Sequence, residues 1–196
     1  MSYFTHHLYT RKPEMEDRVV TISPVSNKAH WSFFAVFDGH GGDFVVNYLS
    51  HNINRILTST IRSLELEIGI IGEGASSEVL ETILKRSCAT ADLEISRLPR
   101  MLVVNGTAKD VSGSTGLMCL ITKTAIAVAN VGDSRALLAQ WDVSAERGVG
   151  GIAVSTPGST GNPDPSESVL LAVPLSVDHK FSITVERDRA LTAGAM

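Results

Sequence analysis

The chain has 196 residues, 43% of them hydrophobic, and a formal net charge of −4. This length and composition are typical of a single globular domain, residues 1–196, with a core of its own. The scattered basic residues argue against nucleic acid as a partner, and apolar runs this short cannot cross a bilayer, so we expect no membrane partner.

Two cysteines, Cys88 and Cys119, stand alone without a CxxC spacing, which is typical of reduced core residues. Residues 1–10 contain no apolar block of the kind found in secretory leaders. We therefore expect a protein of the cell interior, cytoplasmic or nuclear, and we expect a monomer.

From the N-terminus, apolar and β-branched residues predict strands at 2–10, 18–23 and 31–38. The polar segment 24–30 is predicted to turn between the last two strands. The third strand is almost continuously apolar, as expected for a strand that is covered on both faces.

Two helices are predicted next, because apolar residues recur at helical spacing over 43–57 and again over 76–98. Pro99 ends the second helix. Three glycines make segment 68–75 a loop between them.

Three short strands, at 117–122, 125–131 and 135–141, then predict an antiparallel meander. The first two are joined by a tight turn at Lys123 and Thr124. The turn before the third strand contains Gly132 and Asp133.

Segment 144–168 is rich in Gly, Pro and Ser, and we interpret it as a flexible insert within the same domain. A further strand at 169–177 and the start of a helix at 185–191 follow. This order of elements predicts an α+β layered sandwich and argues against a parallel doubly wound sheet.

The stretch from Phe33 to Gly42 shows where chemistry is to be expected. An apolar strand ends in Asp38, and the turn Gly39-His40-Gly41-Gly42 leads directly into a helix. A buried strand that carries a carboxylate at its tip holds a metal ion rigidly, and glycines let the backbone approach that ion or a phosphate. A strand, a glycine turn and a helix also form a plain structural connection, but Glu16-Asp17 and Gly132-Asp133 supply further carboxylates.

Five segments together resemble the metal-dependent serine/threonine protein phosphatases of type 2C, the PPM-type phosphatases. The resemblance covers nearly the whole chain except 144–168. The segments, in order, are Met15-Glu16-Asp17, Phe34-Ala35-Val36-Phe37-Asp38-Gly39-His40-Gly41-Gly42, Ser112-Gly113-Ser114-Thr115, Val131-Gly132-Asp133-Ser134-Arg135-Ala136 and Leu175-Ser176-Val177-Asp178-His179-Lys180.

The resemblance implies the N-terminal part of an α-β-β-α sandwich, with two antiparallel sheets flanked by helices, incomplete at its C-terminus. It implies that Asp38 bridges two metal ions and that the Gly39 carbonyl completes one coordination shell. Glu16 would act on the metals directly or through water, with Asp17 in support. Asp133 would be the ligand of a third, looser ion.

His40 is, by the same resemblance, the general acid that protonates the leaving serine or threonine oxygen. Each role has a structural alternative. His40 could be a hydrogen-bonded turn histidine, and Asp133 could be the Asx residue of a hairpin turn. We interpret Ser114-Thr115 and the segment 178–180 as structural.

The chemistry of the residues fits this family. Hydrolysis of a phosphomonoester needs a nucleophile at neutral pH and neutralisation of charge on the phosphoryl oxygens, and two divalent cations provide both. Ligands that are all oxygen atoms favour Mg²⁺ or Mn²⁺.

Two features depart from the family. An Arg of the family that grips the substrate phosphate is replaced by Lys12, preceded by Arg11, and Lys lacks the bidentate fork of Arg. The family also takes metal ligands from later Asp-Gly and Asp-Asn motifs. Asp38-Gly39 is the only Asp-Gly in this chain, and Asp-Asn does not occur.

We therefore predict a metal-dependent phosphatase acting on phosphoserine and phosphothreonine in phosphoprotein substrates, with weak or no activity in these 196 residues alone. The alternative is a catalytically inactive short relative that binds phosphoproteins or regulates a full-length phosphatase. A third reading, a regulatory α+β domain unrelated to phosphatases, leaves the five segments unexplained. GxxxxGK and GxSxG are absent from the sequence, which argues against a P-loop NTPase or an α/β-hydrolase.

Overall fold

The structure is a computed structural model that describes residues 15–99, 103–104, 107–108, 110–142, 152–153 and 169–194. The strand predicted at 2–10 lies outside these residues, as do Arg11 and Lys12. Most of the predicted insert at 144–168 also lies outside them.

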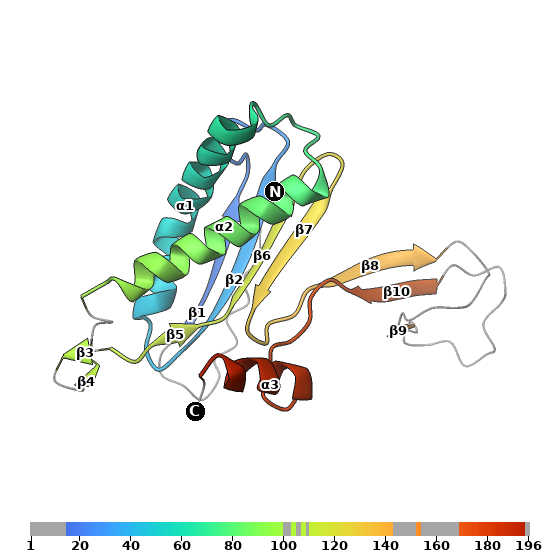
Figure 1. Ribbon diagram of the computed structural model, residues 1–196. Helices are drawn as coiled ribbons and strands as arrows, with labels where there is room; N and C mark the ends of the chain where they lie inside the picture. The colour runs from blue at the N-terminus through green and yellow to red at the C-terminus, as the bar shows by residue number, and fades with distance from the viewer. Residues whose placement is uncertain are drawn as a thin grey trace.

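The main sheet is antiparallel and has the strand order β1-β2-β6-β7 (Figure 1). A short strand, β5, pairs with the end of β2. The strands are β1 (Asp17–Ile22), β2 (Ser32–His40), β5 (Gly113–Ser114), β6 (Gly116–Ile121) and β7 (Ile126–Val131).

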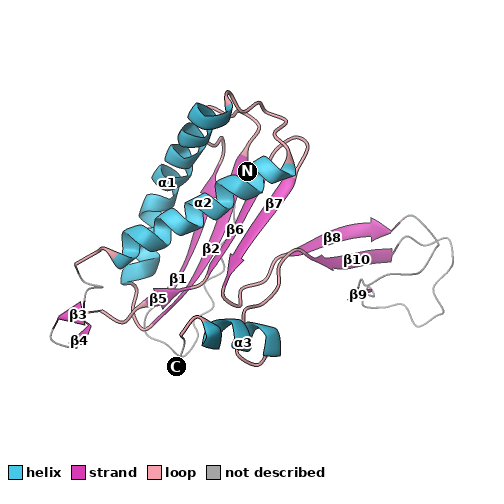
Figure 2. Ribbon diagram, viewed as in Figure 1, coloured by secondary structure: helices cyan, strands magenta, loops and turns pink. Residues whose placement is uncertain are grey.

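Two helices, α1 (Phe44–Ile68) and α2 (Ser77–Ser96), cover the same face of this sheet (Figure 2). The core between the layers is apolar because alternate strand residues and one stripe of each helix point into it. Its largest fully buried side chains are Trp31, Phe33, Phe37, Ile53, Ile56, Leu57, Ile61, Leu80, Ile83, Leu84, Leu120 and Val25.

The opposite face of the sheet is open among the described residues. Val19 is 60% exposed and Val36 is 40% exposed. The prediction that the strand at 31–38 is covered on both faces is therefore wrong for the part of the chain that is described, since its second face meets no packing layer there.

The predicted three-strand meander is also wrong in its third strand. β8 (Leu137–Asp142) leaves the main sheet and pairs with β10 (Val169–Pro174), which also pairs with β9 (Ile152–Ala153). The ribbon formed by β8 and β10 projects from the main sheet (Figure 1). Sequence alternation predicts a strand but does not choose its partner.

The remaining elements are the two-residue strands β3 (Val103–Val104) and β4 (Thr107–Ala108) and the helix α3 (Thr184–Thr192). An α+β fold with antiparallel sheets and three helices is thus confirmed in the described chain. None of its helices combines the length and apolarity needed to cross a membrane.

Several element boundaries differ from prediction, among them the ends of α1, β2 and β10. α1 continues to Ile68 and ends where Gly69 adopts a positive φ of 91°. β2 continues through Gly39 and His40, because these residues pair with Ser114 and Gly113. The predicted turn after Asp38 therefore begins two residues later.

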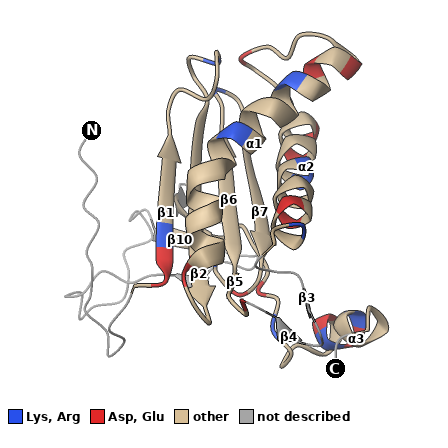
Figure 3. Ribbon diagram, turned by 90° about the vertical axis from the view of Figure 1, so that its left-hand side faces the viewer, with Lys and Arg blue, Asp and Glu red and all other residues tan. Residues whose placement is uncertain are grey.

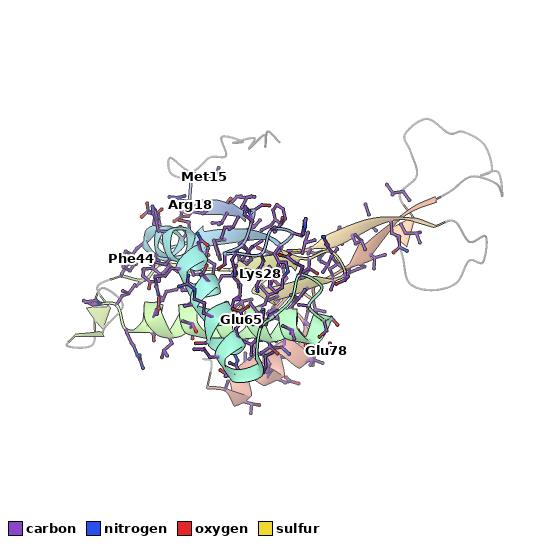
Figure 4. All side chains as sticks on the ribbon, turned by 90° about the horizontal axis from the view of Figure 1, so that it is seen from above. Met15, Arg18, Lys28, Phe44, Glu65 and Glu78 are labelled. Carbon is purple, nitrogen blue, oxygen red and sulfur yellow. The ribbon has the colours of Figure 1, made fainter. Side chains whose placement is uncertain are left out.

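A buried lysine joins the turn after β1 to the far end of α1. The Lys28 ammonium donates hydrogen bonds to Glu65 Oε1 at 2.6 Å and to the carbonyl of Ile71 at 2.5 Å (Figure 4). Only 6% of the Lys28 side chain is exposed. The pair of Lys28 and Glu65 matters for stability because removing one charged side chain would leave the other without its ion-pair partner in a place that water reaches poorly.

We predict that Lys28→Ala lowers the free energy of unfolding by about 2–4 kcal/mol. It removes the donor of the Ile71 carbonyl and leaves Glu65 Oε1 with a long hydrogen bond of 3.4 Å from the Ile71 N–H. Chemical denaturation of the purified chain measures this. Lys85→Ala is the matched control, because Lys85 forms an exposed pair with Glu81, and we expect its effect to stay within about 0.5 kcal/mol. Equal losses in the two variants would contradict the prediction.

The hydrogen bond from Lys28 is the main cause that lowers the pKa of Glu65 below its ordinary value. The ionised Glu65 carboxylate therefore contributes to stability above the ordinary Glu pKa, and this contribution is lost as the pH falls through the lowered pKa of Glu65. In Lys28→Ala the free energy of unfolding should therefore fall less with decreasing pH than it does in the wild-type chain. Denaturation curves of both chains between pH 3 and pH 6 would detect the difference.

Candidate active site

Two carboxylates face each other at one end of the main sheet. Asp17, the first residue of β1, stands directly opposite Asp38 near the end of β2. Figure 3 shows acidic positions at this end of the sheet, where β1 begins and β2 ends. Like charges directly opposite on neighbouring strands are unfavourable unless a proton or a cation compensates them.

The pKa of Asp38 reflects this crowding. It is raised above its ordinary value, first by partial burial, then by the charge and the hydrogen bond of Asp17, and further by the charge of Asp133. His40 acts in the opposite direction. The structure therefore brings together Asp17, Asp38, Asp133 and His40 within electrostatic reach of one another.

Gly39 allows the strands to approach closely here. Its N–H donates to the Glu16 carbonyl at 3.2 Å. A Cβ atom at this position would collide with that carbonyl and would lie 2.6 Å from Val46 Cγ1. Only glycine lets the acidic segment before β1, the end of β2 and α1 come together in this way.

Glu16 lies beside the turn that leads into α1. Its Oε1 accepts a hydrogen bond from the Gly42 N–H at 2.8 Å. The carboxylate thus stabilises the turn in the described structure, and the role of Glu16 toward a metal ion stays a prediction.

Arg18 holds the acidic segment against α1, a contribution that the sequence analysis missed. Its guanidinium donates to the carbonyls of Met15 and Asp17 at 2.8 and 2.9 Å and to Asn47 Oδ1 at 3.0 Å. The sequence places Arg18 directly after the carboxylates Glu16 and Asp17, which could have indicated a role at this site. Its partner on α1, Asn47, is 29 residues away, so no local pattern connects the two.

His40 is the last residue of β2 and is exposed. It lies two residues after Asp38, so the two side chains share one face of the strand. The ring lies against Gly113, where an added Cβ would be 2.7 Å from His40 Nε2. His40 thus lies in a strand and not in a turn, and its role as a general acid or as a structural residue stays a prediction.

Asp133 lies in the turn after β7, and that turn is held by the segment that follows β10. The His179 N–H donates to the Gly132 carbonyl at 2.9 Å, and Asn130 Nδ2 donates to the carbonyls of Gly132 and Val177. Lys180 Nζ lies 3.6 Å from the Asp133 carboxylate.

A bidentate ion pair fixes the same segment. Arg135 donates from Nε and Nη2 to the two oxygens of Asp178, at 3.0 and 2.8 Å. This pairing is the main cause that lowers the pKa of Asp178. The interpretation of segment 178–180 as structural agrees with these contacts, since they position the turn that carries Asp133.

The donor set suits a hard cation. Asp17, Asp38 and Asp133 offer carboxylate oxygens, the ligands that Mg²⁺ and Mn²⁺ prefer. Burial and, after it, the charges of Asp17 and Asp133 raise the pKa of Asp38. Among the described residues, however, no three Asp, Glu, His or Cys side chains already stand in a metal-binding arrangement. The residues fit Mg²⁺ or Mn²⁺ as part of a ligand shell.

A surface groove in the described chain lies elsewhere. It measures about 410 Å³ and is lined by residues of β7 and of the segment after β10, including Val128, Leu175 and His179. It contains none of the predicted site residues. The predicted carboxylates Asp17 and Asp38 lie at the acidic sheet end, whereas no carboxylate lines the groove.

Comparisons with known proteins cover nearly the whole chain. The family profile described as "Protein phosphatase 2C" matches residues 1–196. The chain is 31% identical to Protein phosphatase 1L of Bos taurus over 94% of this chain and 41% of that protein. It is 30% identical to Protein phosphatase 2C 37 of Arabidopsis thaliana, with the same coverage of each. The chain thus spans about two fifths of the length of these relatives.

Solved structures show a similar fold. Serine-threonine phosphatase 2C from Toxoplasma gondii superposes with a TM-score of 0.61 at 24% identity, covering 93% of this chain and 51% of that one. The structure of a Caenorhabditis elegans sex determining protein gives 0.60 at 20% identity, covering 94% of this chain and 36% of that one. At these identities the likeness concerns the fold alone.

We predict that Asp38→Asn stabilises the metal-free chain at neutral pH, because it removes a carboxylate from a crowded acidic group. The gain should be at most about 1 kcal/mol, since the site is solvent-screened. The gain should shrink as the pH falls below the raised pKa of Asp38, and it should vanish below the ordinary Asp pKa, where the wild-type carboxyl is neutral in both the folded and the unfolded chain. Thermal melting in chelator measures this.

The control is Asp92→Asn, a matched change at an exposed position of α2. It should leave the melting temperature nearly unchanged. A metal-free Asp38→Asn chain less stable than wild type at pH 7 would contradict the prediction.

Proposed function

Since the chain belongs to the protein phosphatase 2C family, we propose that it is part of a metal-dependent phosphatase that hydrolyses phosphoserine and phosphothreonine in proteins. The observation that carries the proposal is the facing pair of Asp17 and Asp38, within reach of Asp133. A domain that only binds phosphoproteins has no need of opposed carboxylates at the end of a sheet.

In this proposal the acidic sheet end holds two Mg²⁺ or Mn²⁺ ions, with Asp133 as a ligand for a third. Divalent ions supply the charge neutralisation and the nucleophile that phosphomonoester hydrolysis needs at neutral pH. Asp38 and the Gly39 carbonyl would bind them, supported by Asp17 and Glu16. Asp38 is well placed for this because it lies near the end of a strand whose core face is fully packed.

His40 would act as the general acid. As the phosphorus–oxygen bond breaks, a ring nitrogen of His40 gives its proton to the departing serine or threonine oxygen and regains one from solvent. Its exposure and its position on the same strand face as Asp38 support this role. Arg11 and Lys12, which lie outside the described residues, remain the proposed contacts to the substrate phosphate.

The same proposal extends to the architecture. The open face of the main sheet, with Val19 and Val36 exposed, would be covered by a second antiparallel sheet, completing an α-β-β-α sandwich. The partner would be a phosphoprotein substrate, and we propose a monomeric protein of the cell interior.

The first test is Mn²⁺ binding, followed by hydrolysis of a phosphothreonine peptide. We predict that the chain binds Mn²⁺, that turnover is weak and depends on Mn²⁺ or Mg²⁺, and that Asp38→Asn brings both binding and turnover to background. Asp92→Asn should behave as wild type. Persistent metal-dependent activity in Asp38→Asn would refute the metal assignment, and Mn²⁺ binding without turnover would favour an inactive phosphoprotein-binding relative.

A second prediction concerns the leaving group. His40→Asn should lower kcat on a phosphothreonine peptide by about 10²–10⁴-fold, the usual contribution of a general acid. The loss should be far smaller on p-nitrophenyl phosphate, whose leaving group departs without a proton. Equal losses on the two substrates would argue for a structural role of His40.

A further inference from the structure

The ladder between β2 and its neighbours changes at Thr115. β2 pairs with β6 as far as Val36 opposite Leu117, and with β5 from Gly39 opposite Ser114. By the same register Asp38 stands opposite Thr115. Neither β5 nor β6 includes Thr115.

The hydrogen bonds explain the interruption. The Thr115 N–H donates to the Asp38 carbonyl at 2.8 Å, as in a normal ladder. The Asp38 N–H, however, donates to the Thr115 hydroxyl oxygen at 3.1 Å, in place of the Thr115 carbonyl. That carbonyl instead accepts a hydrogen bond from Ser114 Oγ at 2.6 Å. A side chain thus replaces the backbone at the position opposite Asp38.

The same hydroxyl reaches the turn that carries Asp133. Thr115 Oγ1 lies 2.9 Å from Ser134 Oγ. Since Thr115 Oγ1 already accepts the Asp38 N–H, its own proton is available to donate to Ser134. One hydroxyl therefore joins the end of β2 to the turn after β7.

The methyl group of Thr115 contacts the other side of that turn. Gly132 adopts a φ of +101°, and an added Cβ would lie 2.8 Å from Thr115 Cγ2. The turn approaches Thr115 so closely that only glycine fits. Thr115 therefore holds the residues on both sides of Asp133, Gly132 by packing and Ser134 by a hydrogen bond.

We propose that Thr115 is a positioning residue of the metal centre, which sets the separation between the Asp38 and Asp133 carboxylates through its hydroxyl. The inference rests on the proposed function in one respect, that Asp38 and Asp133 bind metal. A purely structural strand residue would use its own carbonyl in the ladder, and the side chain would be free to vary. Here the side chain bonds both segments that carry the two carboxylates.

The test compares Thr115→Val, which keeps the shape and removes the hydroxyl, with Thr115→Ser, which keeps the hydroxyl. Mn²⁺ binding to the 196-residue chain is measured by electron paramagnetic resonance. We expect Thr115→Val to bind Mn²⁺ about 10- to 100-fold more weakly, the usual cost of losing an outer-shell partner, and Thr115→Ser to bind it nearly as wild type. Thr90→Val, the same chemical change on α2, should have no effect.

A metal-free readout separates this inference from the proposed function. Amide hydrogen exchange of the chelator-treated chain should show faster exchange of the Asp38 N–H in Thr115→Val but not in Thr115→Ser, because only Val removes its acceptor. Exchange that is unchanged in Thr115→Val, or Mn²⁺ binding weakened equally in Thr115→Val and Thr115→Ser, would overturn the assignment.

The two failures are distinguishable. A wild-type chain that binds no Mn²⁺ contradicts the proposed function. In that case faster exchange of the Asp38 N–H in Thr115→Val, but not in Thr115→Ser, would still support Thr115 as the link between the end of β2 and the turn after β7. Unchanged exchange in Thr115→Val would overturn that link.

Discussion

The opposition of Asp17 and Asp38 across β1 and β2 is the constraint on which the rest of the structure depends. The two carboxylates repel each other, yet their register is not free to slip. A shift of one residue would turn the buried rings of Phe33 and Phe37 out of the core. The apolar packing of the sheet against α1 and α2 therefore holds an electrostatically unfavourable pair in place, which is how a fold keeps a cation site preorganised.

Around that pair, segments distant in the sequence are tied together by polar contacts. Arg18 anchors the acidic segment before β1 to α1. The ion pair between Arg135 and Asp178 anchors the segment after β10 to the turn after β7. In these contacts the guanidinium groups of Arg18 and Arg135 bind acceptors other than Asp38. Among the contacts described, Asp38 has no direct hydrogen bond or ion pair with a basic side chain.

The open sheet face relates the chain to its longer relatives. The chain covers 41% of Protein phosphatase 1L, and among the described residues Val19 and Val36, on the sheet face opposite the helices, are exposed. The hydrophobic side of a sheet is normally covered by another layer, which is the reason for proposing a second sheet over this face. The projecting ribbon of β8 and β10 lies beyond this sheet and does not cover it (Figure 1).

The sequence by itself determined the elements and the chemical character of the site. Helical spacing located α1 and α2, and alternation located most strands. The strand ending in Asp38 with its glycine turn indicated a metal site, and five segments together carried the resemblance to the phosphatase family. These signals are local, since they arise from the periodicity of neighbouring residues. Only the tertiary structure decided that β8 pairs with β10, that β2 runs through His40, and that the Thr115 hydroxyl takes the Asp38 N–H from 77 residues away. Such partners are chosen by the packing of the whole sheet, and no local pattern encodes that choice.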